Sequence, residues 1–296
     1  MQKAISDFLK TSEVDFSEKE DLSKRSFIGI GGIYDTASPK DEKTFVELLE
    51  LLLNLGAKFK IIGRLSNTIV AGEKLDVVVT TDKMQGYRLA ENTVTALCGA
   101  RYASLSQKAA SIDISLEPRL SGIPGSLGGM IYCNAGAYGA EISDIFISAT
   151  VYDFHSRRIK VLDRSDMRFS YRRSALSDGG MALISATLRT EKSSSEKVSC
   201  VRCEYMKRRM ESQPVGARTL GSTFKRCGDI CPARLIDELG LKGFSVGGAR
   251  ISPKHAGFIE NSGGATVQDV KILIATVKQR VFDEYGIALE EEIEIV

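Results

Sequence analysis

The stretch that decides the fold of this chain reads Leu120-Ser-Gly-Ile-Pro-Gly-Ser-Leu-Gly-Gly129 and continues as Asn134-Ala-Gly-Ala-Tyr-Gly139. It contains six glycines in eighteen residues. Glycines let the backbone approach a ligand closely and direct successive N–H groups at one point, an arrangement that suits a diphosphate. A glycine-rich turn used only for tight packing is the alternative, because isolated glycine patterns are weak motifs.

The common nucleotide-binding loops do not match this stretch. No Gly-Lys-Ser/Thr ending follows it, and it does not open a strand–turn–helix unit with an acidic residue about twenty positions further on. A second turn, Gly63-Arg-Leu-Ser-Asn67, directly follows an expected strand and offers a hydroxyl and an amide. Two such turns on separate strands are typical of a cofactor held between two subdomains.

Hydrophobic periodicity predicts mixed α and β structure on both sides of these turns. A helix is expected over 41–56, because apolar residues recur at three- and four-residue spacing and Gly56 ends it. Strands are expected over 58–62, 76–81, 93–97, 149–153, 158–162 and 182–189. The small polar run 193–197 is the best candidate for a linker, and the basic stretch 207–211 is expected to be helical.

The last ninety residues read as a separate α/β unit. Thr266-Val-Gln-Asp269 predicts the start of a helix that Gly286 ends. Residues 287–296 then alternate, which predicts a terminal strand with Glu290, Glu292 and Glu294 on one face. Such carboxylates are ordinarily a solvated edge.

Composition indicates a globular protein, with 43% hydrophobic and 26% charged residues. The 40 basic and 38 acidic residues nearly cancel, so neither nucleic-acid nor membrane-surface binding is indicated. Charged residues such as Lys3 and Lys10 interrupt the first twenty positions, which excludes a signal-peptide core there. We therefore expect a cytoplasmic protein with six thiol cysteines. Cys200, Cys203, Cys227 and Cys231 are spaced too loosely to favour a metal site over coincidence.

Two further segments contain residues that could do chemistry. Tyr171-Arg-Arg-Ser174 offers arginine forks for a carboxylate or phosphate, although an arginine pair is more often a surface ion-pair partner. Gly221-Ser-Thr-Phe-Lys225 places a serine after a glycine, without the Gly-x-Ser-x-Gly context of a lipase. The chain has two histidines, so a serine–histidine hydrolase is not favoured.

Taken together and in their order along the chain, these motifs resemble those of the UDP-N-acetylenolpyruvoylglucosamine reductase family (UDP-N-acetylmuramate dehydrogenases). The resemblance runs from about Leu22 to Val296. Its further motifs are Ser26-Phe-Ile-Gly-Ile-Gly-Gly32, Phe169-Ser-Tyr-Arg-Arg-Ser174, Gln213-Pro214, Leu241-Lys-Gly243, Ser252-Pro-Lys-His-Ala256 and Leu289-Glu-Glu-Glu292. Each motif is weak alone, and their ordered set is specific.

The resemblance implies an α+β fold: a p-cresol-methylhydroxylase-type FAD-binding domain of two subdomains and a smaller C-terminal α/β substrate domain. We expect an N-terminal extension over 1–20, the FAD-binding domain over 21–195 and the substrate domain over 196–296. The resemblance also implies non-covalent FAD, NADPH as hydride donor, a UDP-sugar substrate and no metal. We expect a monomer.

Carried over position by position, the resemblance makes Ser222 the proton donor, and Arg172 and Glu292 the pair that polarises the substrate carboxylate. It implies substrate contacts at Tyr171, Gln213 and Lys225. The implied cofactor-binding residues are Gly63, Ser66, Asn67, Thr68, Gly122, Ile123, Pro124, Gly125, Ser126, Gly128, Gly129, Asn134, Gly136, Ala137 and Tyr138.

Three departures from the family pattern stand out. Leu65 replaces the second glycine of the Gly-x-Gly-Ser-Asn turn, where a side chain could crowd the diphosphate. Cys227–Cys231 replaces the usual Asn-Pro after Phe-Lys, and the chain lacks the tyrosine-bearing insertion, which places it in the shorter subclass. The alternatives are another FAD-dependent oxidoreductase of the same superfamily, or a non-catalytic flavin- or nucleotide-binding protein.

Overall fold

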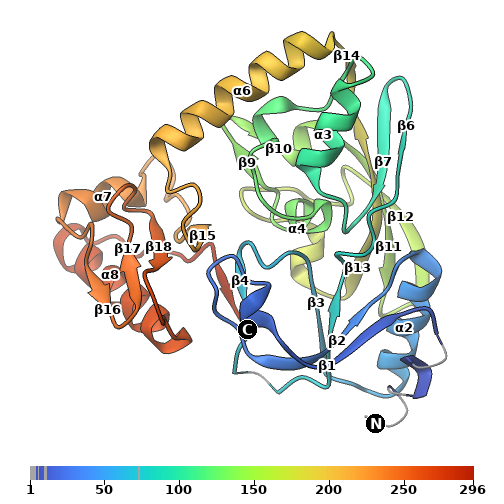
Figure 1. The fold of residues 1–296 in the computed structure, drawn as a ribbon, viewed down its shortest axis with the longest axis horizontal. Helices are drawn as coiled ribbons and strands as arrows, with labels where there is room; N and C mark the ends of the chain where they lie inside the picture. Colours follow the sequence, from blue (N-terminus) through green and yellow to red (C-terminus); the bar gives the residue numbers. More distant parts are fainter. Residues whose placement is uncertain (1–4, 6, 10–11, 73) are drawn as a thin grey trace. The chain divides into compact units, whose positions relative to one another are not determined.

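The computed structural model describes Ile5 and residues 7–9, 12–72 and 74–296 (Figure 1). The chain forms two compact units, each with its own hydrophobic core. The first comprises Met1–Glu20, Tyr34–Arg64 and Lys74–Lys207; the second comprises Asp21–Ile33, Leu65–Glu73 and Arg208–Val296. Parts of the expected N-terminal extension, including Lys3 and Lys10, lie outside the described residues.

A four-stranded sheet opens the first unit. Its order is β1-β2-β5-β3, with bounds β1 (Asp15–Asp21), β2 (Ile33–Ser38), β5 (Val77–Thr80) and β3 (Phe59–Ile62). Strands β2 and β3 both run parallel to β5, so a crossover must join them. Helix α2 (Glu42–Asn54) is that crossover, and its first turn is capped by Asp41, which accepts from Thr44 N at 2.8 Å. The helix and two strands expected here are confirmed.

A five-stranded antiparallel sheet carries the glycine-rich segment. Its order is β12-β11-β13-β7-β6, with bounds β12 (Arg158–Asp163), β11 (Phe146–Asp153), β13 (Met181–Arg189), β7 (Thr93–Leu97) and β6 (Tyr87–Leu89). The four strands expected in this region are confirmed. Helix α4 (Leu127–Tyr132) packs against β7 and β13, so the central strands support the glycine-rich loop that precedes it.

Short elements complete this unit. They are α3 (Tyr102–Ala110), α5 (Ile142–Ile145), the 3-10 turns η2 (Pro118–Leu120) and η3 (Ala175–Asp178), and the paired strands β8 (Ile114–Ser115) with β14 (Glu191–Lys192) and β9 (Gly136–Ala137) with β10 (Ala140–Glu141).

Helix α6 (Ser195–Ser212) corrects the expected linker. Residues 195–197 form its first turn instead of a flexible connection. The reason lies far away in sequence: Asp113 accepts from Ser195 N through its carboxylate at 2.8 Å and from Ser193 N through its carbonyl at 2.9 Å. A carboxylate at a helix N-terminus satisfies an otherwise unpaired amide. The helical prediction for 207–211 is confirmed.

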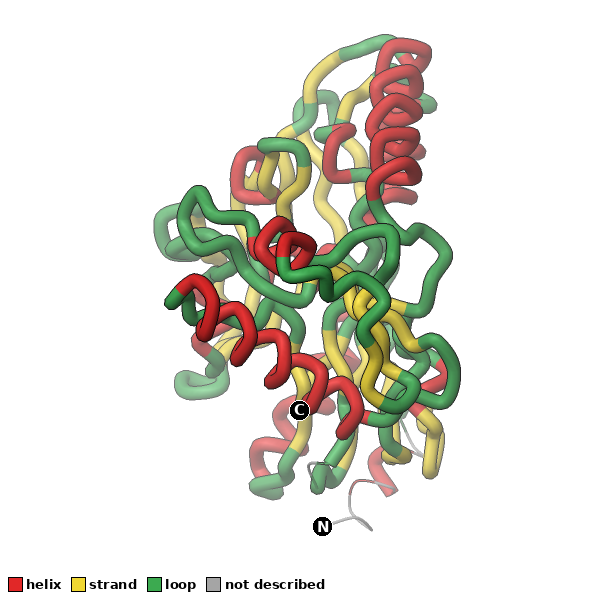
Figure 2. Tube along the Cα trace, turned by 90° about the vertical axis from the view of Figure 1, so that its left-hand side faces the viewer, coloured by secondary structure: helices red, strands yellow, loops and turns green. Residues whose placement is uncertain are grey.

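The second unit is a four-stranded antiparallel sheet with two helices. The sheet order is β15-β18-β17-β16, with bounds β15 (Thr219–Ser222), β18 (Phe258–Asn261), β17 (Ala249–Ile251) and β16 (Ser245–Val246). Helices α7 (Pro232–Glu238) and α8 (Val267–Tyr285) enclose a core with it, and α8 is the long helix in the foreground of Figure 2. Thr266 and Gly286 bound α8 as expected, through a capping box and a left-handed residue.

Two segments from the first quarter of the chain join this second unit. They contain the turn η1 (Leu22–Lys24) and strand β4 (Thr68–Ile69). Strand β4 runs parallel to β19 (Glu294–Ile295). The terminal strand expected over 287–296 is therefore too long: β19 covers two residues, and Glu291 adds an isolated bridge to Phe224. The segment has only short partners on either side, which limits regular pairing.

No helix in the described ranges has the length and apolar character needed to cross a membrane.

Candidate functional site

The glycine-rich loop is tied to the end of β7 before α4 begins. Leu127 N donates to Ala100 O at 2.8 Å, and Gly128 N donates to Cys98 O at 2.7 Å. A Cβ at Gly128 would lie 3.1 Å from that carbonyl oxygen, so the close approach requires glycine. Gly125 has φ +134°, a conformation that residues with a side chain rarely adopt.

Within the first unit, the two turns expected to hold a cofactor meet. A Cβ at Gly63 would lie 2.5 Å from the Oγ of Ser126. Ser126 is buried, and its Oγ accepts from Gly129 N at 3.3 Å as the N-cap of α4. At Gly63 and Gly128 the backbone therefore packs against Ser126 and Cys98 more closely than a side chain readily allows. Glycine-rich backbone of this kind fits a cofactor diphosphate that is bound by main-chain amides rather than by lysines.

Replacing Gly63 with alanine is expected to weaken FAD binding about fivefold, since the new Cβ must displace Ser126 and disturb a helix cap that contributes about 1 kcal/mol. Fluorescence titration of the apoprotein with FAD measures this. Gly56→Ala is the matched control: its Cβ meets nothing within 4 Å, so it should cost stability alone. In the double variant Gly63→Ala/Ser126→Gly, part of the FAD affinity should return. Wild-type affinity in Gly63→Ala alone would contradict the role of Gly63 in FAD binding.

Leu65 has a left-handed backbone, which glycine adopts more readily than leucine. Its φ is +51°, in the left-handed region, and its carbonyl accepts from Phe27 N at 3.1 Å. A leucine there costs about 1–2 kcal/mol. Its side chain is 4% exposed, and burying it contributes about 1.5–3 kcal/mol, which offsets that cost. The turn is therefore retained despite the substitution.

Asn134 organises the loop from inside. It is 1% exposed, its Nδ2 donates to Glu141 Oε2 at 2.8 Å and to Ser170 O at 3.0 Å, and its Oδ1 accepts from Ser143 N. These bonds use both amide hydrogens. The side chain of Asn134 therefore has no further hydrogen to donate to a cofactor.

Arg172 is held beside the same loop. Its Nη2 donates to Gly136 O at 3.3 Å, and its Nη1 lies 3.8 Å from Glu141 Oε1. Its guanidinium lies 4.8 Å from the ring centre of Tyr171, and its side chain is 16% exposed. The residue has φ +55°. A strained backbone conformation of this kind is kept only where several surrounding contacts hold it, as happens at ligand-binding sites.

Ser222 ends strand β15 in the second unit. Gly221 before it has φ +82°, and a register irregularity separates Thr219 from Ser222. The Ser222 hydroxyl donates to Phe224 O at 3.2 Å. Ser222 itself still pairs with Phe258, so the irregularity between Thr219 and Ser222 changes which face of the sheet its side chain occupies.

The C-terminal segment runs beside this serine. Glu292 N donates to Thr223 O at 2.8 Å, and Lys225 N donates to Glu290 O at 2.8 Å. The Lys225 ammonium also pairs with the Glu290 carboxylate. Ser222, Lys225 and Glu292, which the sequence separates by up to seventy residues, therefore lie on two neighbouring segments of one unit.

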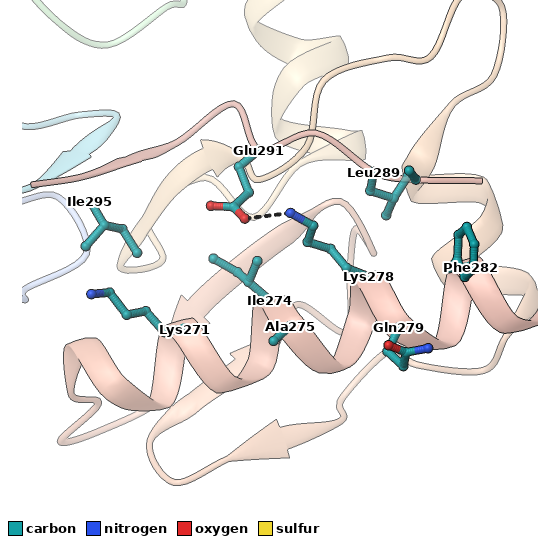
Figure 3. Close-up of a pocket in the computed structure, with 10 residues that line it drawn as sticks. Lys271, Ile274, Ala275, Lys278, Gln279, Phe282, Leu289, Glu291 and Ile295 are labelled. Carbon is teal, nitrogen blue, oxygen red and sulfur yellow. Dashed lines mark hydrogen bonds and ion pairs between the residues drawn. The ribbon is translucent and has the colours of Figure 1, made fainter. Parts of the chain in front are cut away.

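Glu291, next to Glu292 in the chain, contacts helix α8. Figure 3 shows its carboxylate directed toward α8, where Lys278 Nζ lies 3.0 Å from Oε1. The two residues line a groove of about 630 Å³ with Ile274, Phe282 and Leu289. None of the predicted site residues lines this groove.

The remaining predicted residues divide between the units. Gln213 lies beyond α6 and accepts from Arg209 Nε at 2.8 Å, while Ser66, Asn67 and Thr68 belong to the second unit. Gly122, Ile123, Pro124, Ala137 and Tyr138 belong to the first.

Sequence reasoning missed Tyr205, whose ring centre lies 4.8 Å from that of Tyr138. No sequence pattern links these tyrosines, since they are 67 positions apart.

Cys98 is buried and His255 is half-buried. Burial raises the pKa of the Cys98 thiol to about 12, so it is unreactive near neutral pH. Burial lowers the pKa of His255, whose Nδ1 accepts from Gly257 N at 3.1 Å.

Comparison with known proteins shows the family to which the chain belongs. Residues 213–296 match the family described as UDP-N-acetylenolpyruvoylglucosamine reductase, C-terminal domain, and residues 36–160 match the FAD binding domain. A UDP-N-acetylenolpyruvoylglucosamine reductase of Caldicellulosiruptor saccharolyticus is 37% identical over 292 residues, covering 97% of this chain and 94% of the relative. The chain belongs to the UDP-N-acetylenolpyruvoylglucosamine reductase family. A relative from Clostridioides difficile with the same name is 32% identical, covering 96% of this chain and 94% of its own.

A solved member of the reductase family has the same fold. The crystal structure of the enzyme from Thermus caldophilus matches with a TM-score of 0.79 at 28% identity, covering 96% of this chain and 98% of that one. The expected α+β class, with an FAD-binding domain followed by a smaller C-terminal domain, is confirmed.

Proposed function

We propose that this reductase-family chain uses NADPH and FAD to reduce the enolpyruvyl ether of UDP-N-acetylglucosamine to UDP-N-acetylmuramate, a step in making peptidoglycan precursors. The observation that carries the proposal is the pairing of the Ser222 strand with the Glu292 segment. It places a hydroxyl and a carboxylate on neighbouring backbone segments, which simple nucleotide binding does not require.

Non-covalent FAD would be held by the backbone surface of Gly63 and the Ser121–Gly139 loop, with Ser66, Asn67 and Thr68 supplying the remaining predicted contacts. We propose that 21–195 form the FAD-binding domain and 196–296 the substrate domain. Hydride from NADPH reaches the substrate's methylene carbon by way of FAD, which is the redox chemistry the cofactor supplies.

Arg172 is the group proposed to stabilise the negative charge that develops in this reaction. Hydride addition at the methylene carbon pushes an electron pair toward the substrate carboxylate, and a planar guanidinium fork matches the resulting enediolate. Gly136 O and Glu141 hold the fork in place, so little reorganisation is needed. Glu292 is the second group proposed to polarise that carboxylate.

Ser222 then supplies the proton. It is delivered to the carbon next to the new methyl group, which completes a net addition of hydride and proton across the double bond. A serine hydroxyl is a weak acid, and it can act here because the carbanionic intermediate is a strong base.

One anaerobic experiment tests the proposed function. The purified protein should show a flavin spectrum, lose its visible absorbance with NADPH, and regain it when the enolpyruvyl substrate is added. A protein that takes up no FAD would refute the flavoenzyme assignment. A reduced flavin that the substrate does not reoxidise would refute the substrate assignment, and oxygen consumption with an alcohol and no NADPH would favour an oxidase.

The UDP-sugar and NADPH are the partners proposed for this chain. A monomeric state and a cytoplasmic location stay predictions from the sequence; size-exclusion chromatography with light scattering measures the first, and cell fractionation the second.

A further inference from the structure

Asn67 connects the second turn of the cofactor site to the C-terminal segment. Its Nδ2 donates to the main-chain carbonyl of Glu292 at 3.0 Å, across 225 positions of sequence. Its own carbonyl accepts from Glu294 N at 3.0 Å. The next residue, Thr68, is the register partner of Glu294 in the parallel pair β4–β19. Asn67 therefore holds the segment through both its side chain and its backbone.

Both main-chain polar groups of Glu292 are thereby fixed. The amide donates to Thr223 O at 2.8 Å, next to Ser222, and the carbonyl accepts from Asn67. On the opposite side of the segment, Lys278 pairs with Glu291 at 3.0 Å, as the dashed line in Figure 3 shows. A peptide held in this way has few ways to rotate, so the direction in which the Glu292 side chain leaves the backbone is set.

We propose that Asn67 is a positioning residue, which fixes Glu292 relative to Ser222 and makes the cofactor turn and the catalytic segment one structural element. The inference rests on the proposed function, because it takes Glu292 as a catalytic group. It differs from the expected role of Asn67 as a cofactor contact alone. One amide hydrogen of its side chain is committed to the Glu292 carbonyl, a task that no hydroxyl or carboxylate of similar size performs equally well at this site.

Asn67→Asp is the sharpest variant. It keeps the size of the side chain but turns an acceptor toward the Glu292 carbonyl, so the bond is lost and repulsion takes its place. We expect reoxidation of the reduced enzyme by the enolpyruvyl substrate to slow by about 10- to 100-fold, since a misplaced catalytic group costs up to about 100-fold. Flavin reduction by NADPH should keep its wild-type rate. Asn92→Asp, at an exposed asparagine in the other unit, is the matched control and should change neither half-reaction.

Two further measurements separate positioning from cofactor binding. If Asn67 acts through Glu292, Asn67→Ala should add little to the loss already caused by Glu292→Gln, because effects through a shared group are not additive. Hydrogen exchange of residues 288–296 should quicken in Asn67→Ala and Asn67→Asp, with each variant saturated with FAD so that lost cofactor does not contribute to the difference.

The outcomes are distinct. Failure of the wild-type enzyme to reduce the substrate would refute the proposed function. With a working wild type, the inference is overturned if FAD-saturated Asn67 variants slow both half-reactions equally, leave the exchange of residues 288–296 unchanged, or show fully additive losses with Glu292→Gln. Asn67→Ser provides a second small variant if Asn67→Ala does not fold, and the same results are expected of it.

Discussion

Ser222→Ala is expected to abolish substrate reduction while leaving flavin reduction by NADPH intact. The variant removes the only group proposed to give its proton to the carbanionic intermediate, and a positioned proton donor contributes about 100- to 10,000-fold. Alanine keeps the backbone of β15, whose Ser222 hydroxyl makes one hydrogen bond, to Phe224 O. Stopped-flow absorbance of the flavin, with NADPH and substrate mixed in separate steps, measures both half-reactions.

Ser222→Cys refines the same test. A thiol is a stronger acid than a hydroxyl and can still donate a proton, so this variant should recover part of the activity that alanine loses. Ser245→Ala, an exposed serine on β16 of the same sheet, is the control and should behave as the wild type. Equal loss of both half-reactions in Ser222→Ala would remove the residue from the role of proton donor.

Elements governed by local patterns were predictable from the sequence. Helix α8 begins after the Thr266 capping box and ends at Gly286 because each signal acts within one helical turn. Strand β7 has the bounds expected, since its residues alternate between buried and exposed positions. The order of the motifs also predicted the family, which the comparisons confirm.

Features that depend on distant partners could not be predicted. The first turn of α6 is ordered by Asp113, 82 positions before Ser195, and it was mistaken for a linker. Residues 21–33 and 65–73 belong to the second unit because they contact the C-terminal third of the chain. The sequence pattern of these short segments does not predict those contacts. The Asn67–Glu292 hydrogen bond could not be predicted for the same reason, since its partners lie 225 positions apart.

In the candidate site, too, some features could be predicted from the sequence and others could not. Resemblance predicted which residues to examine, and the structure supplies their supports: Gly136 and Glu141 beside Arg172, and Thr223 beside Glu292. Gly136 and Thr223 act through backbone carbonyls, which any residue type could provide, and Glu141 lies 31 positions before the arginine that it supports. Sequence alone therefore cannot single them out.

Arg172→Ala is expected to slow substrate-driven flavin reoxidation by about 100- to 1,000-fold, the usual effect of removing one donor aimed at developing charge. Arg172→Lys should recover only part of this loss, because a lysine keeps the charge but lacks the planar fork. Both variants have a Cβ, so the cost of the left-handed backbone at φ +55° is similar in each. The difference between them therefore measures the geometry of the guanidinium.

The same variants separate catalysis from stability. Arg173 is the matched control, because its side chain is 66% exposed and pairs with Asp178 at 2.6 Å on the surface. Arg173→Ala should leave both half-reactions unchanged, since exposed ion pairs contribute about 0–1 kcal/mol to stability and none to this chemistry. Arg172→Ala should also raise the KM for the enolpyruvyl substrate, as the carboxylate loses its partner, without changing the rate of reduction by NADPH. Wild-type turnover in Arg172→Ala would exclude this arginine from the reaction and leave Glu292 as the group that polarises the carboxylate.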